Sequence, residues 1–187
     1  MNADQVRRAL AGFVPDSDED TDARPAAVAL ILIEGATGLE VLFIHRAERA
    51  GDPWSGQVAF PGGRYEVRDT HLGTTAVRET MEEIAVDLSG AEHLGTLSDL
   101  RPRTPLLPPV YVRPFVYLLA QRPDLTLSAE VQAAFWVPLQ RFSEPDARRD
   151  VQLAVRGINL EVTAFIAGER LIWGMTERIL TSFLQLL

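Results

Sequence analysis

The sequence contains no cysteine, and all 18 of its basic residues are arginine. Without cysteine the chain can form no disulfide and no zinc–thiolate site, and it has no thiol nucleophile. It also lacks an apolar run of about 20 residues, the length that a membrane-spanning helix needs, so we expect no membrane partner. Residues 1–14 lack the long apolar centre of a secretory signal, and we therefore expect a cytoplasmic protein.

Negative charge exceeds positive charge, because 26 acidic residues and 18 arginines give a formal net charge of −8 at pH 7. This surplus argues against sequence-independent binding of nucleic acid, so we expect no nucleic-acid partner. A chain of 187 residues, of which 47% are hydrophobic and 24% are charged, is typical of one soluble domain with a sizeable core. We therefore predict a single domain over residues 1–187.

The stretch from residue 60 to residue 88 contains the most informative pattern. It begins with a Pro-Gly-Gly turn, continues through a polar loop and ends in a predicted helix. The apolar face of this helix, which we expect to pack against a sheet, consists of Val77, Met81, Ile84 and Leu88. The opposite face carries Glu79, Glu82 and Glu83 within an arc of about 100°.

Three carboxylates this close together repel one another unless water screens them or cations lie between them. Oxygen ligands of this kind suit Mg²⁺ or Mn²⁺. A solvated acidic helix face would show the same residues, but two neighbouring features favour a metal site. Arg78 can pair with Glu82 one turn further on. The glycines of the Pro-Gly-Gly turn allow backbone carbonyls to approach an ion or a phosphate closely.

The residues Gly63, Asp69, Arg78-Glu79 and Glu82-Glu83 resemble the Nudix box of the Nudix hydrolases. That box reads Gly, five residues, Glu, seven residues, Arg-Glu, an aliphatic residue, any residue, Glu-Glu, any residue, Gly and an aliphatic residue. Four features of this chain depart from it: Asp69 replaces Glu, eight residues precede Arg78, Thr80 takes the aliphatic position, and Ala85 replaces the last Gly. The extra residue lies in a loop, where insertions are tolerated, and we expect Ala85 to alter the helix end only slightly.

The resemblance implies the α/β class, as a Nudix-type α/β/α sandwich with a mixed β-sheet, and the succession of apolar segments agrees with it. We expect a helix and an acidic loop within residues 1–24 and a C-terminal helix at 175–187. Adjacent central strands are predicted at 26–34 and 39–46, and a hairpin is predicted around Gly157. Pro114, in a predicted strand at 111–120, indicates a bulge or a sheet edge.

A second resemblance lies upstream of the box and points to coenzyme A diphosphatases of the Nudix group. These enzymes carry a segment that reads LLTxR(S/A), three residues, Arg, three residues, Gly, three residues and FPGG. Similar residues in this chain are Leu42–Ala47, Gly56 and Phe60–Gly63. The segments Pro114–Val116, Phe135–Leu139 and Trp173–Leu180 also resemble that branch. One extra residue separates Arg46 from Gly56, however, and Asp52 stands where the branch has its arginine.

The family resemblance implies hydrolysis of a nucleoside diphosphate linked to another group, with coenzyme A or a derivative as the leading substrate. The alternatives are a nucleotide sugar, ADP-ribose or a nucleoside triphosphate, and a non-catalytic nucleotide-binding module. Mg²⁺ or Mn²⁺ would be held by Glu79, Glu82, Glu83 and the backbone of Gly63. Glu79 would act as the base and Arg78 would orient the glutamates, with Asp69 supporting them indirectly.

The substrate is expected to contact Arg46, Trp54, Gln57, Gly62 and Gly63, although the loop position of Trp54 on its own favours a packing role over a stacking surface for a base. The Pro-rich loop at 101–109 is interpreted either as a surface connector or as a lip of the substrate site. Specificity is expected in the loops 50–57, 101–109 and 146–170. The resemblance is also compatible with a homodimer.

Overall fold

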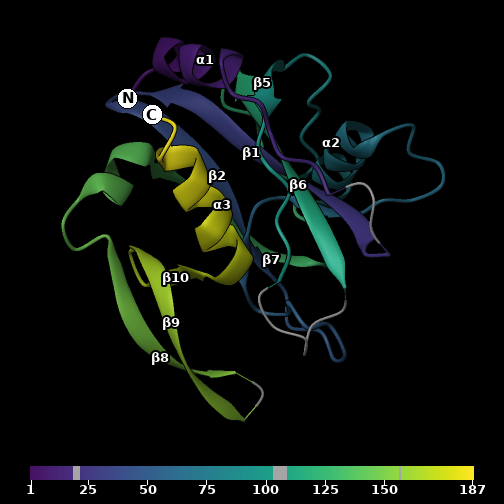
Figure 1. The fold of residues 1–187 in the computed structure, drawn as a ribbon, viewed down its shortest axis with the longest axis vertical. Helices are drawn as coiled ribbons and strands as arrows, with labels where there is room; N and C mark the ends of the chain where they lie inside the picture. Colours follow the sequence, from purple (N-terminus) through teal and green to yellow (C-terminus); the bar gives the residue numbers. More distant parts are fainter. Residues whose placement is uncertain (19–21, 103–108, 156) are drawn as a thin grey trace.

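The computed structural model describes residues 1–18, 22–102, 109–155 and 157–187. Within these residues, seven strands form a mixed sheet (Figure 1). They are β1 (Arg24–Gly35), β2 (Gly38–Arg46), β3 (Val58–Ala59), β4 (Gly62–Arg64), β5 (Glu92–Thr96), β6 (Val110–Leu119) and β7 (Val131–Pro138). The central order is β3-β2-β1-β6-β5, with β4 paired to β1 and β7 paired to β2. The β1–β6 pair is parallel and the other pairs are antiparallel.

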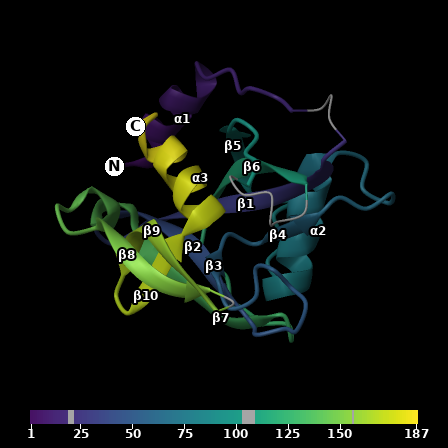
Figure 2. The same ribbon diagram turned by 60° about the horizontal axis from the view of Figure 1, so that its bottom comes forward.

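Helices cover both faces of this sheet, as Figure 2 shows. Alternate residues of β1 point to opposite faces, so Leu30 and Leu32 join a core with α1 (Ala3–Ala11) and α3 (Gly174–Leu184). Ala29 and Ile31 join a second core with α2 (Leu72–Ile84). The predicted α/β/α layering and the two covered central strands are thereby confirmed.

A second sheet follows the short 3₁₀ helix η1 (Leu139–Ser143). Its strands β8 (Arg148–Val155), β9 (Ile158–Ala167) and β10 (Arg170–Trp173) lie in the order β10-β9-β8. The hairpin predicted around Gly157 is confirmed, and Gly157 takes a left-handed φ of 77° that favours glycine. Strand β10 was not predicted, because four residues directly before a helix carry too little periodicity.

The edge position predicted from Pro114 is wrong, because β6 lies between β1 and β5. The register shift in the β5–β6 ladder falls between His93 and Gly95 instead. Registered pairing with β5 stops at Thr96 and Phe115, and the Pro114 carbonyl then accepts the N–H of Leu97 at 2.9 Å. An interior strand therefore tolerates proline here, where the β5 ladder has ended.

Several predicted boundaries shift by a few residues. The N-terminal helix ends at Ala11 and β1 already begins at Arg24, while the C-terminal helix runs from Gly174 to Leu184. Parts of the acidic loop (19–21) and of the Pro-rich loop (103–108) lie outside the described residues, as does residue 156. None of the described helices has the length and apolarity that crossing a bilayer requires.

Candidate active site

The two glycines of the Pro-Gly-Gly segment begin strand β4 rather than forming a free turn. Gly62 and Gly63 pair with Val28 and Ala27 of β1. A Cβ at Gly62, whose φ is 151°, would overlap with the Ala27 carbonyl, and a Cβ at Gly63 would overlap with the Glu79 carboxyl group. The missing side chains therefore let the carboxylate of Glu79 lie directly against the sheet.

Helix α2 turns a different face to the sheet from the one that the apolar pattern predicted. Its buried residues include Ala76, Thr80 and Ile84, whereas Met81 is 44% exposed. Leu88 is buried but lies beyond the helix end, and Val77 is only partly buried. This rotation of about one residue carries Glu83 into the interior, where it is only 3% exposed. The prediction that all three glutamates lie opposite the packed face is therefore wrong for Glu83.

Glu83 is a buried carboxylate with partners on two strands. One oxygen accepts the N–H of Gly62 at 2.9 Å, and the other lies 3.5 Å from the Arg46 Nη1. Burial raises the pKa of Glu83 to about 8, although these two partners favour the charged form. A further cation beside this carboxylate would relieve that cost of burial.

Glu79 lies one turn earlier on α2, in a less buried position. Burial raises the pKa of Glu79 as well, opposed by the charge of Arg78 and by its hydrogen bond. The Arg78 Nη1 donates to Glu79 Oε1 at 3.0 Å. Glu79 is thereby held in one orientation against Gly63.

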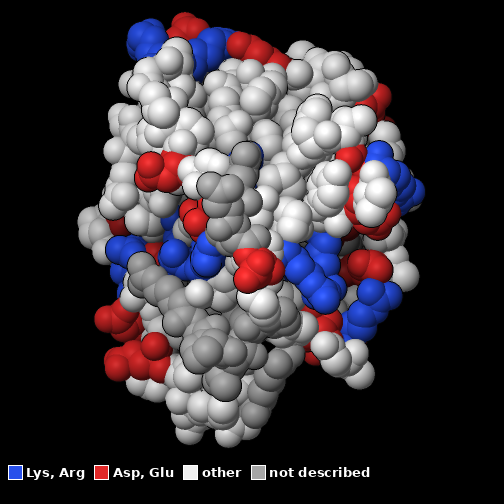
Figure 3. Space-filling model, turned by 45° about the vertical axis from the view of Figure 1, so that its right-hand side comes forward, with Lys and Arg blue, Asp and Glu red and all other residues white. Residues whose placement is uncertain are grey.

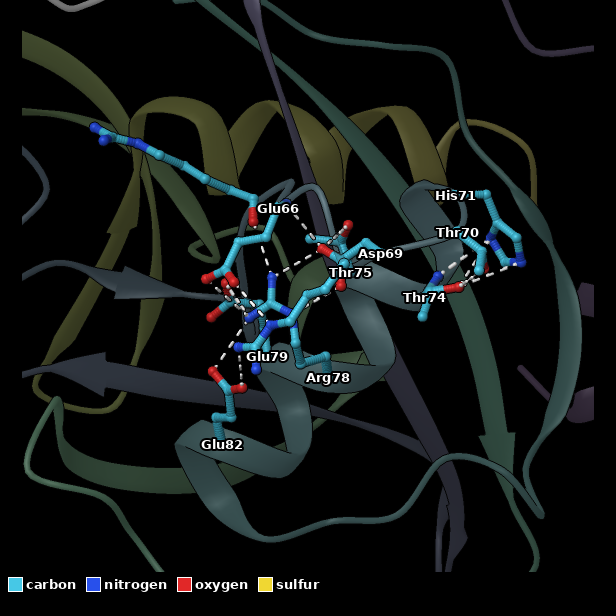
Figure 4. A network of polar contacts seen from close by, with 11 residues as sticks. Glu66, Asp69, Thr70, His71, Thr74, Thr75, Arg78, Glu79 and Glu82 are labelled. Atoms are coloured by element: carbon cyan, nitrogen blue, oxygen red, sulfur yellow. Dashed lines mark hydrogen bonds and ion pairs between the residues drawn. The ribbon is translucent and has the colours of Figure 1, made fainter.

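Arg78 is the centre of the polar network drawn in Figure 4. It donates to both oxygens of buried Asp69, from Nε at 2.9 Å and from Nη2 at 3.0 Å. Its Nη2 also donates to the carbonyl of Arg64 at 3.0 Å. Arg78 keeps the pKa of Asp69 well below its usual range. The network ties the loop before α2 to the helix and to the end of β4, and the orienting role of Arg78 stays a prediction.

Glu82 has other partners on the outside of the helix (Figure 4). Its side chain is 48% exposed, and its two oxygens lie 3.0 Å from Arg68 Nη2 and 3.1 Å from Arg78 Nη1. The structure therefore brings Glu79 and Glu83 together at the glycines of β4 but directs Glu82 elsewhere.

A cavity of about 560 Å³ opens over Glu79 and Glu83. It collects all of the residues predicted to bind substrate and two of the three predicted metal-binding glutamates: Arg46, Trp54, Gln57, Gly62, Gly63, Glu79 and Glu83. Arg78 and Glu82 do not line it. Trp54 packs partly against the core and also faces the cavity, so the two alternatives for this residue are compatible.

The comparisons with known proteins agree with this geometry. The NUDIX domain family model matches residues 23–155. The chain belongs to the Nudix family. The Nudix hydrolase NudL of Yersinia pestis, itself described as uncharacterized, is 33% identical over 132 residues, which cover 70% of this chain and 64% of NudL. The uncharacterized protein C14C4.10c of Schizosaccharomyces pombe is 35% identical over 118 residues, which cover 60% of this chain and 36% of that protein. The chain thus spans less than two thirds of the length of either relative.

Solved structures share the Nudix fold at lower identity. A MutT/nudix family protein from Enterococcus faecalis has a TM-score of 0.59 and 19% identity, covering 98% of this chain and 68% of its own. A binary complex of the Caenorhabditis elegans Ap4A hydrolase has a TM-score of 0.53 and 21% identity, covering 63% and 81%. The NUDIX domain of Shewanella oneidensis NrtR, complexed with ADP ribose, has a TM-score of 0.50 and 22% identity, covering 73% and 84%.

Local backbone conformation and hydrogen bonds accommodate three residues that depart from the Nudix box, namely Ala85, Thr80 and Asp69. Ala85, in the place of the final glycine, ends α2 in the left-handed region with φ 57°, and its N–H donates to the Met81 carbonyl at 3.0 Å. The helix thus ends as a glycine would end it. Thr80, in the aliphatic position, is buried and donates its hydroxyl to the Ala76 carbonyl at 2.7 Å. Asp69 reaches Arg78 despite its shorter side chain.

The Nudix motif of this chain fits a divalent cation through two carboxylates. Over the described part of the chain, no three His, Cys, Asp or Glu side chains already converge as a metal site. Glu79 and Glu83 nevertheless share one cavity wall, where burial raises the pKa of both. Mg²⁺ at phosphate-processing sites commonly takes one or two carboxylates and completes its shell with water and substrate phosphates. The donor set is therefore appropriate for such an ion.

Sequence reasoning missed the cavity wall contributed by distant elements. Met175, Thr176 and Ile179 of α3 line the cavity, as do Val110 and Val112 of β6. The only sequence signal for the α3 part of this wall was the resemblance of Trp173–Leu180 to the coenzyme A branch. Nothing in its periodicity distinguishes a cavity wall from an ordinary core face.

Proposed function

We propose that this protein is a divalent-metal-dependent diphosphatase acting on nucleoside diphosphate derivatives. The observation that carries the proposal is the placement of Glu79 and Glu83 against Gly62 and Gly63, within a cavity that Arg46 also lines. Buried carboxylates opposite an arginine suit a cation-bound anionic substrate.

The proposed ligands of Mg²⁺ or Mn²⁺ are Glu79, Glu82, Glu83 and the backbone of Gly63. When bound, the ion would supply charge neutralisation at the diphosphate and a more acidic water. Glu79 is proposed as the general base, because it lines the cavity beside Gly63 and its hydrogen bond from Arg78 holds the carboxylate in one orientation. Arg78 fixes the orientation of Glu79. Glu82 would have to leave Arg68 to take part.

The cavity combines a charged end with an apolar wall, which suits a substrate with an anionic diphosphate and a less polar remainder. Trp54 offers a ring at this cavity on which a base can stack. The finer proposal is coenzyme A or a derivative, supported by the resemblance upstream of the Nudix box. ADP-ribose, a nucleotide sugar or a nucleoside triphosphate is the alternative, favoured by the ADP ribose in the NrtR complex. A homodimer stays a prediction.

A product assay tests the proposal. The protein is incubated with Mg²⁺ or Mn²⁺ and coenzyme A, acyl-coenzyme A, ADP-ribose, dinucleoside polyphosphates or nucleoside triphosphates, and products are identified by mass. Glu83→Gln should abolish metal-dependent cleavage, whereas Glu144→Gln, an exposed control beside Arg141, should not. Release of 3′,5′-ADP and phosphopantetheine would support coenzyme A. Nucleotide binding without cleavage would replace the proposal with the binding-module alternative.

A further inference from the structure

Arg46 lies between two carboxylates at the charged end of the cavity. Its Nη2 lies 2.8 Å from Asp52 Oδ2, a short contact, and its Nη1 lies 3.5 Å from Glu83 Oε1, a long one. The side chain of Arg46 is 22% exposed, and those of Asp52 and Glu83 are 15% and 4% exposed. The Arg46 guanidinium therefore pairs mainly with Asp52 and contacts Glu83 only weakly.

The backbone around this trio is well anchored. The N–H of Arg46 donates to the Gln57 carbonyl at 3.0 Å, which closes the loop that carries Asp52. The second oxygen of Asp52 accepts the N–H of Trp54 at 3.0 Å. One carboxylate oxygen of Asp52 thus accepts a hydrogen bond from the loop backbone, and the other pairs with Arg46.

These contacts leave one hydrogen-bond donor of the Arg46 guanidinium without a partner among the described residues. This donor is Nε, which is buried. With all three groups ionised, two carboxylates and one guanidinium leave a net charge of −1. Without the charge of Asp52, Arg46 and Glu83 would form a neutral pair, and the guanidinium would close on the remaining carboxylate.

We propose that Asp52 is a positioning residue that keeps Arg46 from closing on Glu83. Asp52 thereby leaves the Glu83 carboxylate accessible to a divalent cation and directs Arg46 toward an anionic group of the substrate. This inference rests on the proposed function only in taking Glu83 as a cation ligand.

The test measures Mn²⁺ binding to metal-free protein by calorimetry, without substrate. Asp52→Asn removes the charge but keeps an oxygen for the Trp54 N–H. It should weaken Mn²⁺ binding about fivefold, because a competing ion-pair change of about 1 kcal/mol corresponds to a factor of that size. Adding Arg46→Met to this variant should restore the affinity to the wild-type value or tighter, since the competing cation is gone.

Glu130→Gln is the matched control. Glu130 also lines the cavity and also pairs with an arginine, but its partner Arg49 makes no ion pair with Glu83. If Glu130→Gln and Asp52→Asn weaken binding equally, the effect is general electrostatics and the inference fails. It fails equally if the loss persists in the Arg46→Met background.

A Glu83→Gln variant separates this inference from the proposed function. Unchanged Mn²⁺ binding in Glu83→Gln would overturn the metal assignment itself. Lost binding in Glu83→Gln together with unchanged binding in Asp52→Asn would overturn only the role of Asp52. Circular dichroism checks that each variant is folded, and Asp52→Ser replaces Asp52→Asn in all comparisons if the latter does not fold.

Discussion

Among the polar interactions around α2, the contact between Asp69 and Arg78 should cost the most free energy of unfolding when it is removed. Asp69 accepts two hydrogen bonds from Arg78, one from the Thr75 hydroxyl at 2.8 Å and one from the Glu66 N–H at 3.0 Å. Asp69→Asn keeps the size of the side chain but leaves Arg78 without its bidentate partner. Breaking one side of a buried ion pair costs about 3–5 kcal/mol.

We expect a loss near the lower end of that range, because Arg78 retains Glu79 and Glu82 as partners. A loss of about 3 kcal/mol corresponds to a fall in Tm of about 6–12 °C for a domain of this size. The assay is urea unfolding at pH 7, followed by circular dichroism. The exposed pair of Arg141 and Asp146 supplies the control, since Asp146→Asn should change the unfolding midpoint little.

The pH dependence gives the same prediction an independent test. The native pKa of Asp69 lies below its ordinary value of 3.8, so its ionised form is the one that folding favours. Its contribution is therefore fully present above pH 3.8 and is lost as the pH falls toward the native pKa. The stability gap between wild type and Asp69→Asn should narrow below that pH. A gap under about 1 kcal/mol at pH 7, smaller than the buried-pair range, would refute the reasoning. A gap that stays constant at lower pH would refute it as well.

Three further predictions follow from the motif. Ala85→Gly should stabilise the protein by about 1 kcal/mol in urea unfolding, because it relieves a left-handed alanine; a loss of stability would contradict the assigned conformation. Gly63→Ala should lower turnover about 100-fold, because its Cβ would displace Glu79, and a misplacement of about 1 Å at a reacting group has an effect of that size. The control is Gly90→Ala, whose Cβ meets no atom within 4 Å and which should be neutral in the same assay. Glu82→Gln should keep its melting temperature but lose most metal-dependent turnover; full activity with unaltered metal affinity would remove Glu82 from the site.

The parts of the fold that follow from local pattern were predictable. The segments that became β1 and β2 are apolar on both faces, and only a strand covered on both sides suits such a sequence. The hairpin at Gly157 follows from a turn residue between two alternating segments. The Nudix box placed Glu79 and Arg78 on one helix and singled out Asp69 as an indirect support of the glutamates, but the direct pairing of Asp69 with Arg78 came only from the structure.

The interior position of Glu83 could not be predicted in the same way. The apolar pattern assigns the packed face to Val77, Met81, Ile84 and Leu88 and places Glu83 on the opposite face. Thr80 can be buried because the Ala76 carbonyl accepts its hydroxyl. Burial of Glu83 depends on the N–H of Gly62, which is more than twenty positions away in the chain. Such partners become visible only once the strands are paired.

Strand β1 explains why these separate features meet at one place. It pairs with β2, β4 and β6, so it sets the positions of Arg46 at the end of β2, of Gly62 and Gly63 on β4, and of Val112 on β6. Ala26 and Val28 of β1 itself line the cavity between them. Helix α2 packs on the opposite face of the same strand through Ala76 and Ile84. A single strand thus sets where the backbones that carry the glutamates and Arg46 lie, while the side-chain contact between Arg46 and Glu83 also depends on the ion pair of Arg46 with the loop residue Asp52.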